Sequence, residues 1–201
     1  GLPPGRQARL NDDDIRAIKN HFEKEIEYMA PRLWVNAGEI SHHDKKAAFD
    51  VRGESPDIVH IDAFSMAEGR FIKKLDMENR RKVAIIGRRV AETLFAEDEE
   101  PIGEYVKING TEYMVTGIFK SDRRGERAED DEKTIFIPLT TAQQVTNQPG
   151  RIGWFVCTID QRYKVSDVQD RLRTLLKARH KIHPDDEQGV RYASVEQEVK
   201  E

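Results

Sequence analysis

VAIIGRRVAETLF (residues 83–95) and EYVKINGTEYMVTGIF (residues 104–119) carry the clearest structural pattern in the chain. The run from Val83 to Gly87 is short, apolar and closed by glycine, which predicts a buried strand. Residues 88–95 then place four apolar side chains at helical spacing, which predicts a short helix. Its inward side is expected to hold Val90, Ala91, Leu94 and Phe95.

The second run predicts a β-hairpin. Residues 105–108 and 111–115 alternate apolar and polar side chains around Asn109-Gly110. Both turn residues tolerate a positive φ, which a two-residue hairpin turn requires. The second strand is expected to continue to Phe119, and Pro101-Ile102-Gly103 predicts a turn before the first strand.

The N-terminal third predicts one helix followed by strands. Asn11 is a good N-cap for a helix from Asp12 to Phe22, and the acidic residues of its first turn suit the positive end of the helix dipole better than they suit a metal ion. The residues from Tyr28 to Val35 predict a strand that Pro31 restricts to an edge or a strand start. Residues 47–51 predict a further strand.

The C-terminal part starts with a charged segment, residues 120–133, in which eleven residues are charged. It predicts a mobile loop, with a partner-contacting arm as the alternative. A strand at 134–139, a short helix or turn at 140–146 and a strand at 154–160 follow. Ser166 and Gln169 predict a capping box that starts a helix. His183-Pro184 is expected to end this helix region, and residues 190–195 predict a closing strand.

Two strand-plus-helix segments therefore flank a hairpin-rich middle. This order predicts an α+β fold with two subdomains, the first built from both ends of the chain. We place the first subdomain at residues 1–60 and 151–201 and the inserted one at residues 61–150.

Composition excludes some classes of function. The chain has 33 Lys and Arg against 37 Asp and Glu, a net charge of −4, and no basic stripe, which argues against a nucleic-acid binder. No segment has the roughly 20 apolar residues of a membrane span, and no signal peptide is visible. The chain begins Gly-Leu-Pro-Pro, so we expect it to be a fragment of a longer protein.

Few residues suggest chemistry. Cys157 lies in an apolar strand pattern, which predicts a buried, inert thiol. His180 is expected to interact with a helix C-terminus. His42-His43-Asp44 resembles a metal site, but adjacent strand residues face opposite ways and zinc needs three or four converging ligands. We therefore interpret it as a solvated hairpin turn and predict no catalytic, cofactor-binding or metal-binding residue.

Five blocks of the middle segment, in this order, resemble the MacB-like periplasmic core domains of ABC-transporter permeases. They are Val83–Gly87, Val90–Phe95, Glu100–Gly103, Val106–Gly110 and Tyr113–Phe119. Flanking residues extend the resemblance over most of the chain, from about residue 11 to residue 195. It implies a βαβ-rich porter-like lobe made from both chain ends and an inserted mixed α/β, hairpin-rich lobe that is called sabre-like.

The resemblance also implies a role and partners. Such domains lie between the first two transmembrane helices of a four-helix permease, on the periplasmic face of the bacterial inner membrane. They pass motion from a cytoplasmic ABC ATPase to the periplasm, which is called mechanotransmission, and serve export. The implied partners are the chain's own transmembrane helices, a second permease copy and the ATPase, with a periplasmic adaptor or an exported substrate left open. The isolated fragment is expected to be monomeric, non-catalytic and without cofactor.

The alternative is a free-standing periplasmic metal-binding or hydrolytic protein that uses His42, His43 and Asp44. A further alternative within the transporter class is that the two lobes enclose a substrate such as a lipid or a peptide.

Overall fold

The computed structural model describes residues 9–181 and residue 185. They divide into two units. The terminal unit comprises the described part of residues 1–32 and 149–201, and the inserted unit comprises residues 33–148. The predicted closing strand at 190–195 and the predicted helix stop at His183-Pro184 lie outside the described residues.

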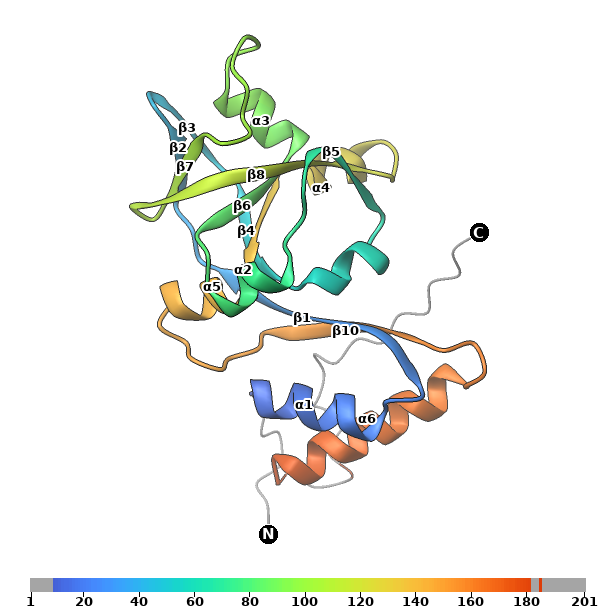
Figure 1. The fold of residues 1–201 in the computed structure, drawn as a ribbon. Helices are drawn as coiled ribbons and strands as arrows, with labels where there is room; N and C mark the ends of the chain where they lie inside the picture. Colours follow the sequence, from blue (N-terminus) through green and yellow to red (C-terminus); the bar gives the residue numbers. More distant parts are fainter. Residues whose placement is uncertain (1–8, 182–184, 186–201) are drawn as a thin grey trace. The chain divides into compact units, whose positions relative to one another are not determined.

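The terminal unit contains two helices and one antiparallel strand pair. Strand β1 (Ile26–Val35) pairs with β10 (Trp154–Ile159) from Ile26 to Arg32. Helices α1 (Asp12–His21) and α6 (Val165–Arg179) contact each other and lie side by side along this pair (Figure 1). Their apolar stripes are buried and form the core of the unit, with Ile15, Ile18, Phe22, Val168, Leu172 and Leu176.

Strand β1 continues into the inserted unit, where Leu33 to Val35 pair with β4. At Pro31 the strand has β10 on one side, and the pairing with β4 starts only two residues later. A proline without an N–H therefore breaks no ladder there, because its missing donor falls where β1 has a single neighbour. The prediction that Pro31 restricts its strand to an edge or a strand start is wrong, because β1 lies between β10 and β4 and Pro31 is in its middle, and only the position of Pro31 itself is edge-like.

The inserted unit is built on a mixed sheet. Its strands, in spatial order, are β4 (Asp50–Glu54), β9 (Thr134–Pro138), β6 (Val83–Gly87), β8 (Thr111–Ser121), β7 (Tyr105–Ile108), β2 (Glu39–His42) and β3 (Lys45–Ala48). Strand β8 pairs with β7 through its first residues and with β5 (Phe64–Gly69) through its last ones. The pairs β4–β9 and β6–β8 are parallel and the other pairs of this sheet are antiparallel.

Short helices complete the inserted unit. They are the 3-10 helix η1 (Pro56–His60) and the α-helices α2 (Lys74–Glu78), α3 (Arg88–Leu94), α4 (Glu126–Asp131) and α5 (Leu139–Val145). An aromatic cluster of Phe64, Phe71, Phe119 and Phe136 packs with Ile72 and Ile85 in its core. The rings of Phe119 and Phe136 stack at 4.7 Å, which ties β8 to β9 across β6.

The central prediction is confirmed almost residue by residue. Strand β6 has the predicted bounds, α3 ends one residue before the predicted end, and Val90, Ala91, Leu94 and Phe95 are buried. Asn109 and Gly110 adopt φ angles of 49° and 80°, as the hairpin turn requires. The predicted α+β fold class is confirmed, because the described residues form a sheet of ten strands together with α-helices.

Three further predictions need correction. The strand predicted at 47–51 is two strands, because β3 pairs with β2 whereas β4 pairs with β1 and β9. The charged segment 120–133 is not a loop throughout: it continues β8 to Ser121 and forms α4, and its Glu132 is buried. Helix α6 begins at Val165, so Ser166 lies inside the first turn and does not cap it.

The boundary predicted between residues 60 and 61 lies within the inserted unit. Residues 33–60 belong there because β2 pairs with β7 and β4 pairs with β9. The other predicted boundary, at 150/151, lies two residues from the observed one at 148/149. The porter-like and sabre-like character of the two units stays a prediction.

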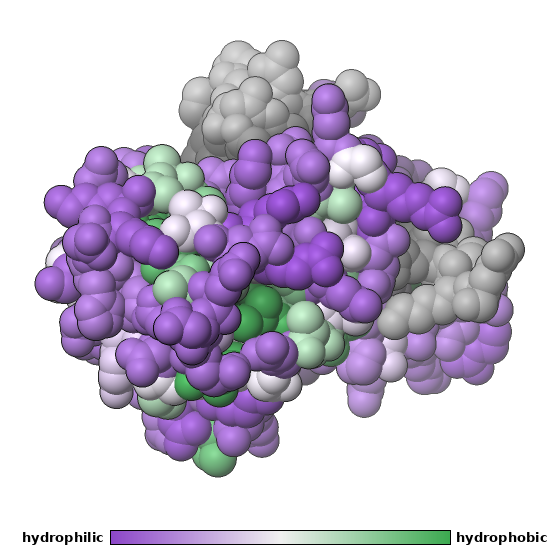
Figure 2. All heavy atoms as spheres, turned by 90° about the horizontal axis from the view of Figure 1, so that it is seen from above, coloured by the Kyte–Doolittle hydropathy of each residue, from purple (hydrophilic) through white to green (hydrophobic). Residues whose placement is uncertain are grey.

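Hydrophilic side chains cover most of the face seen in Figure 2, with scattered hydrophobic ones between them. This agrees with a chain in which 35% of residues are charged. Within the described residues, no helix combines the length and the apolar character that a membrane crossing needs.

Candidate functional site

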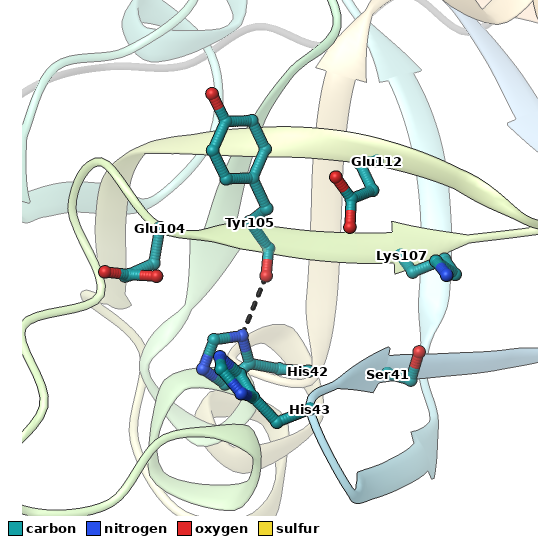
Figure 3. A pocket seen from close by; sticks show the side chains of 7 residues that line it. All are labelled: Ser41, His42, His43, Glu104, Tyr105, Lys107 and Glu112. Atoms are coloured by element: carbon teal, nitrogen blue, oxygen red, sulfur yellow. Dashed lines mark hydrogen bonds between the residues drawn. The ribbon is translucent and has the colours of Figure 1, made fainter.

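A pocket of about 310 Å³ lies beside the β2–β3 hairpin of the inserted unit. Two histidines from the end of β2 and the following turn sit beneath the backbone of Tyr105 in β7 (Figure 3). The pocket is lined by Ser41, His42, His43, Glu104, Tyr105, Lys107 and Glu112.

His42 is held in place on several sides. It is the last residue of β2, and its side chain is only 3% exposed. Its Nδ1 lies 2.8 Å from the carbonyl oxygen of Tyr105, and because a carbonyl only accepts, Nδ1 donates this hydrogen bond. The ring stacks on Phe95 at 4.0 Å, and Nε2 lies 2.9 Å from Oε2 of Glu99. These contacts fix the orientation of the His42 ring and place a proton on its Nδ1.

His43 lies in the turn between β2 and β3 with a φ of 54°. At this left-handed position the alternation of strand side chains ends. The rings of His43 and His42 consequently lie with their centroids 4.2 Å apart instead of on opposite faces. The predicted hairpin turn is confirmed, but the prediction that it is solvated is wrong for His42, which is buried.

Glu99 comes from the loop after α3, 57 residues along the chain from His42. Its Oε1 accepts a hydrogen bond of 2.9 Å from the backbone N–H of Ala96. This bond and the hydrogen bond from His42 hold the pKa of Glu99 below its ordinary value, so the carboxylate is ionised at neutral pH.

The structure thus assembles His42, His43 and Glu99, whose ligand atoms lie within 4.8 Å of one another. The alternative prediction from the sequence was a metal-binding or hydrolytic site made of His42, His43 and Asp44. Asp44 is exposed and is not part of this cluster. The local sequence around the histidines contains no sign of Glu99, because the fold alone brings the two segments together.

A second cluster of charged side chains lies in the terminal unit. The buried carboxylate of Asp14 accepts hydrogen bonds from the backbone N–H of Asn11 at 3.0 Å and from Nε of Arg179 at 2.8 Å. Nε2 of His180 lies 2.7 Å from Oδ2 of the same Asp14 carboxylate. We call Asn11, Asp14, Arg179 and His180 the Asp14 cluster. It joins the start of α1 to the end of α6, so His180 contacts Asp14 in addition to capping α6.

Cys157 is buried in β10, as predicted, and burial raises the pKa of its thiol to about 12. Since the thiolate is the reactive form, we expect the native chain to react with a disulfide reagent at pH 8 far more slowly than the urea-unfolded chain, by about a hundredfold or more. Following thiol release by absorbance checks this. Equal rates in the two states would contradict the burial of Cys157.

Residues 2–175 match the family model described as the MacB-like periplasmic core domain. The chain belongs to this family. The MacB-like domain is 29% identical, over 178 residues, to the macrolide export ATP-binding/permease protein MacB of Bdellovibrio bacteriovorus. That match covers 89% of the chain and 27% of the relative, so the chain spans about a quarter of the length of this relative.

Two solved structures share the fold. The periplasmic region of MacB from Actinobacillus actinomycetemcomitans has a TM-score of 0.75 at 18% identity, covering 87% of this domain and 77% of that chain. The extracellular domain of the ABC-type transporter YknZ from Gram-positive bacteria has a TM-score of 0.74 at 14% identity. The match covers 88% of this domain and 87% of that chain. The resemblance predicted from the segment 83–119 is thereby confirmed.

Proposed function

We propose that this MacB-like domain is the extracytoplasmic, periplasmic part of an ABC-transporter permease and that it has no catalytic activity of its own. In this proposal it transmits motion driven by ATP hydrolysis on the cytoplasmic side and so serves export of a substrate. The observation that carries the proposal is the match of residues 2–175 to the family, in a chain that spans 27% of a relative named as an ATP-binding/permease protein.

The connectivity of the domain supports a mechanical role. The first and the last described helices, α1 and α6, both belong to the terminal unit, and the Asp14 cluster joins them. Transmembrane helices attached at the two chain ends would therefore act on one unit. Strand β1 then continues from that unit into the inserted unit without a break.

The proposed partners follow from the same role. They are the chain's own transmembrane helices, a second copy of the permease and a cytoplasmic ABC ATPase, together with a periplasmic adaptor or the exported substrate. The isolated chain is proposed to be monomeric, since the membrane helices and the ATPase would enforce dimerisation. Sedimentation velocity of the 201-residue chain tests this point.

The experiment that tests the proposal measures motion in the full-length permease with its ATPase in lipid. We place single spin labels at Glu97→Cys in the inserted unit or at Arg173→Cys in the terminal unit, both exposed. Buried Cys157 is expected to stay unlabelled. Trapping the ATPase with ATP and vanadate is expected to change the distance between labels in the two permease copies.

A matched measurement with an ATPase that cannot hydrolyse ATP is expected to show no vanadate-dependent change. Unchanged distances at both label positions, in a preparation with active ATPase, would overturn the proposed coupling. ATP hydrolysis by the isolated 201-residue chain would overturn its non-catalytic role.

A further inference from the structure

We propose that His42, His43 and Glu99 form a binding site for one divalent transition-metal ion, with Zn²⁺ as the best match. The three side chains come from the end of β2, the β2–β3 turn and the loop after α3. Two imidazoles and one carboxylate are a donor set that suits zinc, whereas Mg²⁺ and Ca²⁺ prefer oxygen ligands alone.

The distances fit a shared ion. All three ligand atoms lie within 4.8 Å of one another, and Nε2 of His42 lies 2.9 Å from Oε2 of Glu99. Ligand atoms around a tetrahedral zinc ion are about 3.3–3.5 Å apart, given bonds of about 2.0–2.1 Å. The separation between His42 and Glu99 is slightly shorter than this value, and the other two separations are at most 4.8 Å. Small rotations of the two exposed side chains, His43 and Glu99, would bring the three ligand atoms to the separations of a tetrahedral zinc site.

The surroundings of two ligands are those of a metal site. His42 donates its Nδ1–H to the carbonyl of Tyr105, which leaves Nε2 as the ligand atom and fixes the ring. A metal-binding histidine usually makes this kind of second contact through its other nitrogen. Glu99 is held likewise, because its Oε1 accepts from Ala96 N–H. Its Oε2 faces Nε2 of His42, and a bound ion would take the place of the proton that lies between these two atoms.

Access to the ion is open. His43 and Glu99 are exposed, and both histidines line the pocket of about 310 Å³, so water can provide the fourth ligand of a three-residue zinc site (Figure 3). Bound metal would connect the β2–β3 hairpin to the loop after α3. The proposal departs from the prediction that the chain has no metal ligands, and it does not depend on the proposed transport function.

Calorimetric titration of the 201-residue chain with ZnCl₂ at neutral pH tests the site. The expected result is one Zn²⁺ per chain with at least micromolar affinity, together with a rise in melting temperature. His43→Asn keeps a residue that tolerates the positive φ, and Glu99→Gln keeps the side-chain shape. Each is expected to weaken binding by at least about tenfold.

Asp44→Asn is the matched control, because Asp44 neighbours His43 in the same turn and lies outside the cluster. Its affinity for Zn²⁺ is expected to equal that of the unchanged chain. Co²⁺ bound in place of zinc is expected to show the visible bands of a tetrahedral site. The proposal is overturned if no one-to-one binding occurs, which would leave His42 and Glu99 as an ordinary ion pair, or if the three variants bind alike while circular dichroism shows them folded.

Discussion

Gly87→Ala is expected to lower the free energy of unfolding by about 3–5 kcal/mol. Gly87 ends β6 and precedes the first turn of α3, and a Cβ at this position would lie 2.1 Å from the carbonyl oxygen of Glu132. That oxygen accepts the N–H groups of Arg89 at 3.2 Å and Val90 at 3.4 Å. The added methyl group would displace backbone, which costs about 1–3 kcal/mol, and would weaken both hydrogen bonds at about 1 kcal/mol each.

Urea unfolding followed by circular dichroism measures this loss, and Gly38→Ala is its control. A Cβ at Gly38 would meet no atom within 4 Å, and the N–H that Gly38 donates to Asn109 is kept by alanine. The control is expected to stay within about 0.5 kcal/mol of the unchanged chain. Equal stability of the two variants would mean that the backbone of Glu132 does not approach Gly87 as closely as the structure places it.

The close approach at Gly87 also marks what the sequence could and could not predict. The strand, the helix after it and the Asn109-Gly110 hairpin follow from local patterns, because each depends on residues within a few positions of one another. The contact of Gly87 with Glu132 joins residues 45 positions apart. The sequence therefore predicted a strand-to-helix junction at Gly87 but not its partner.

Two other errors concern the charged segment 120–133 and the start of α6. The segment 120–133 has too few apolar side chains to predict packing, yet Ser121 donates a hydrogen bond to Asp131, and Arg88 pairs with buried Glu132 from another element. At α6, the serine pattern at 166 suggested a cap. The helix instead begins at Val165, and its N-cap residue, Lys164, makes no side-chain cap hydrogen bond.

The cluster of His42, His43 and Glu99 shows most clearly what the sequence alone cannot predict. The two histidines are adjacent in sequence and were found, but strand alternation argued that they diverge. The positive φ of His43 removes that argument, and a histidine at such a position carries no distinct sequence signal. Glu99 is one of several acids between residues 97 and 100, and nothing in their order distinguishes it. Only the placement of α3 beside the hairpin selects it.

Asp14→Ala is expected to destabilise the chain by about 2–4 kcal/mol. The Asp14 side chain is 1% exposed, and its two oxygens satisfy the Asn11 N–H, Arg179 and His180. Removing one partner of a buried ion pair costs about 3–5 kcal/mol, and the partial exposure of Arg179 reduces this figure. One of the two capping-box bonds at the start of α1, from Asn11 N–H to Asp14, is lost at the same time, which adds to the effect, whereas the bond from the N–H of residue 14 to the Asn11 side chain is kept.

Asp13→Ala is the matched control in the same helical turn. The Asp13 side chain is 70% exposed and pairs with Arg16 at the surface, so its loss is expected to cost less than about 1 kcal/mol. A double-mutant cycle with Arg179→Ala then separates the two roles of Asp14. If Asp14 joins the two helices, the coupling energy between Asp14 and Arg179 is expected to be about 1–3 kcal/mol, measured by urea unfolding. A coupling energy near zero with a large single effect would show that Arg179 does not join the two helices through Asp14, and would assign the cost to the cap of α1 and to the contact with His180.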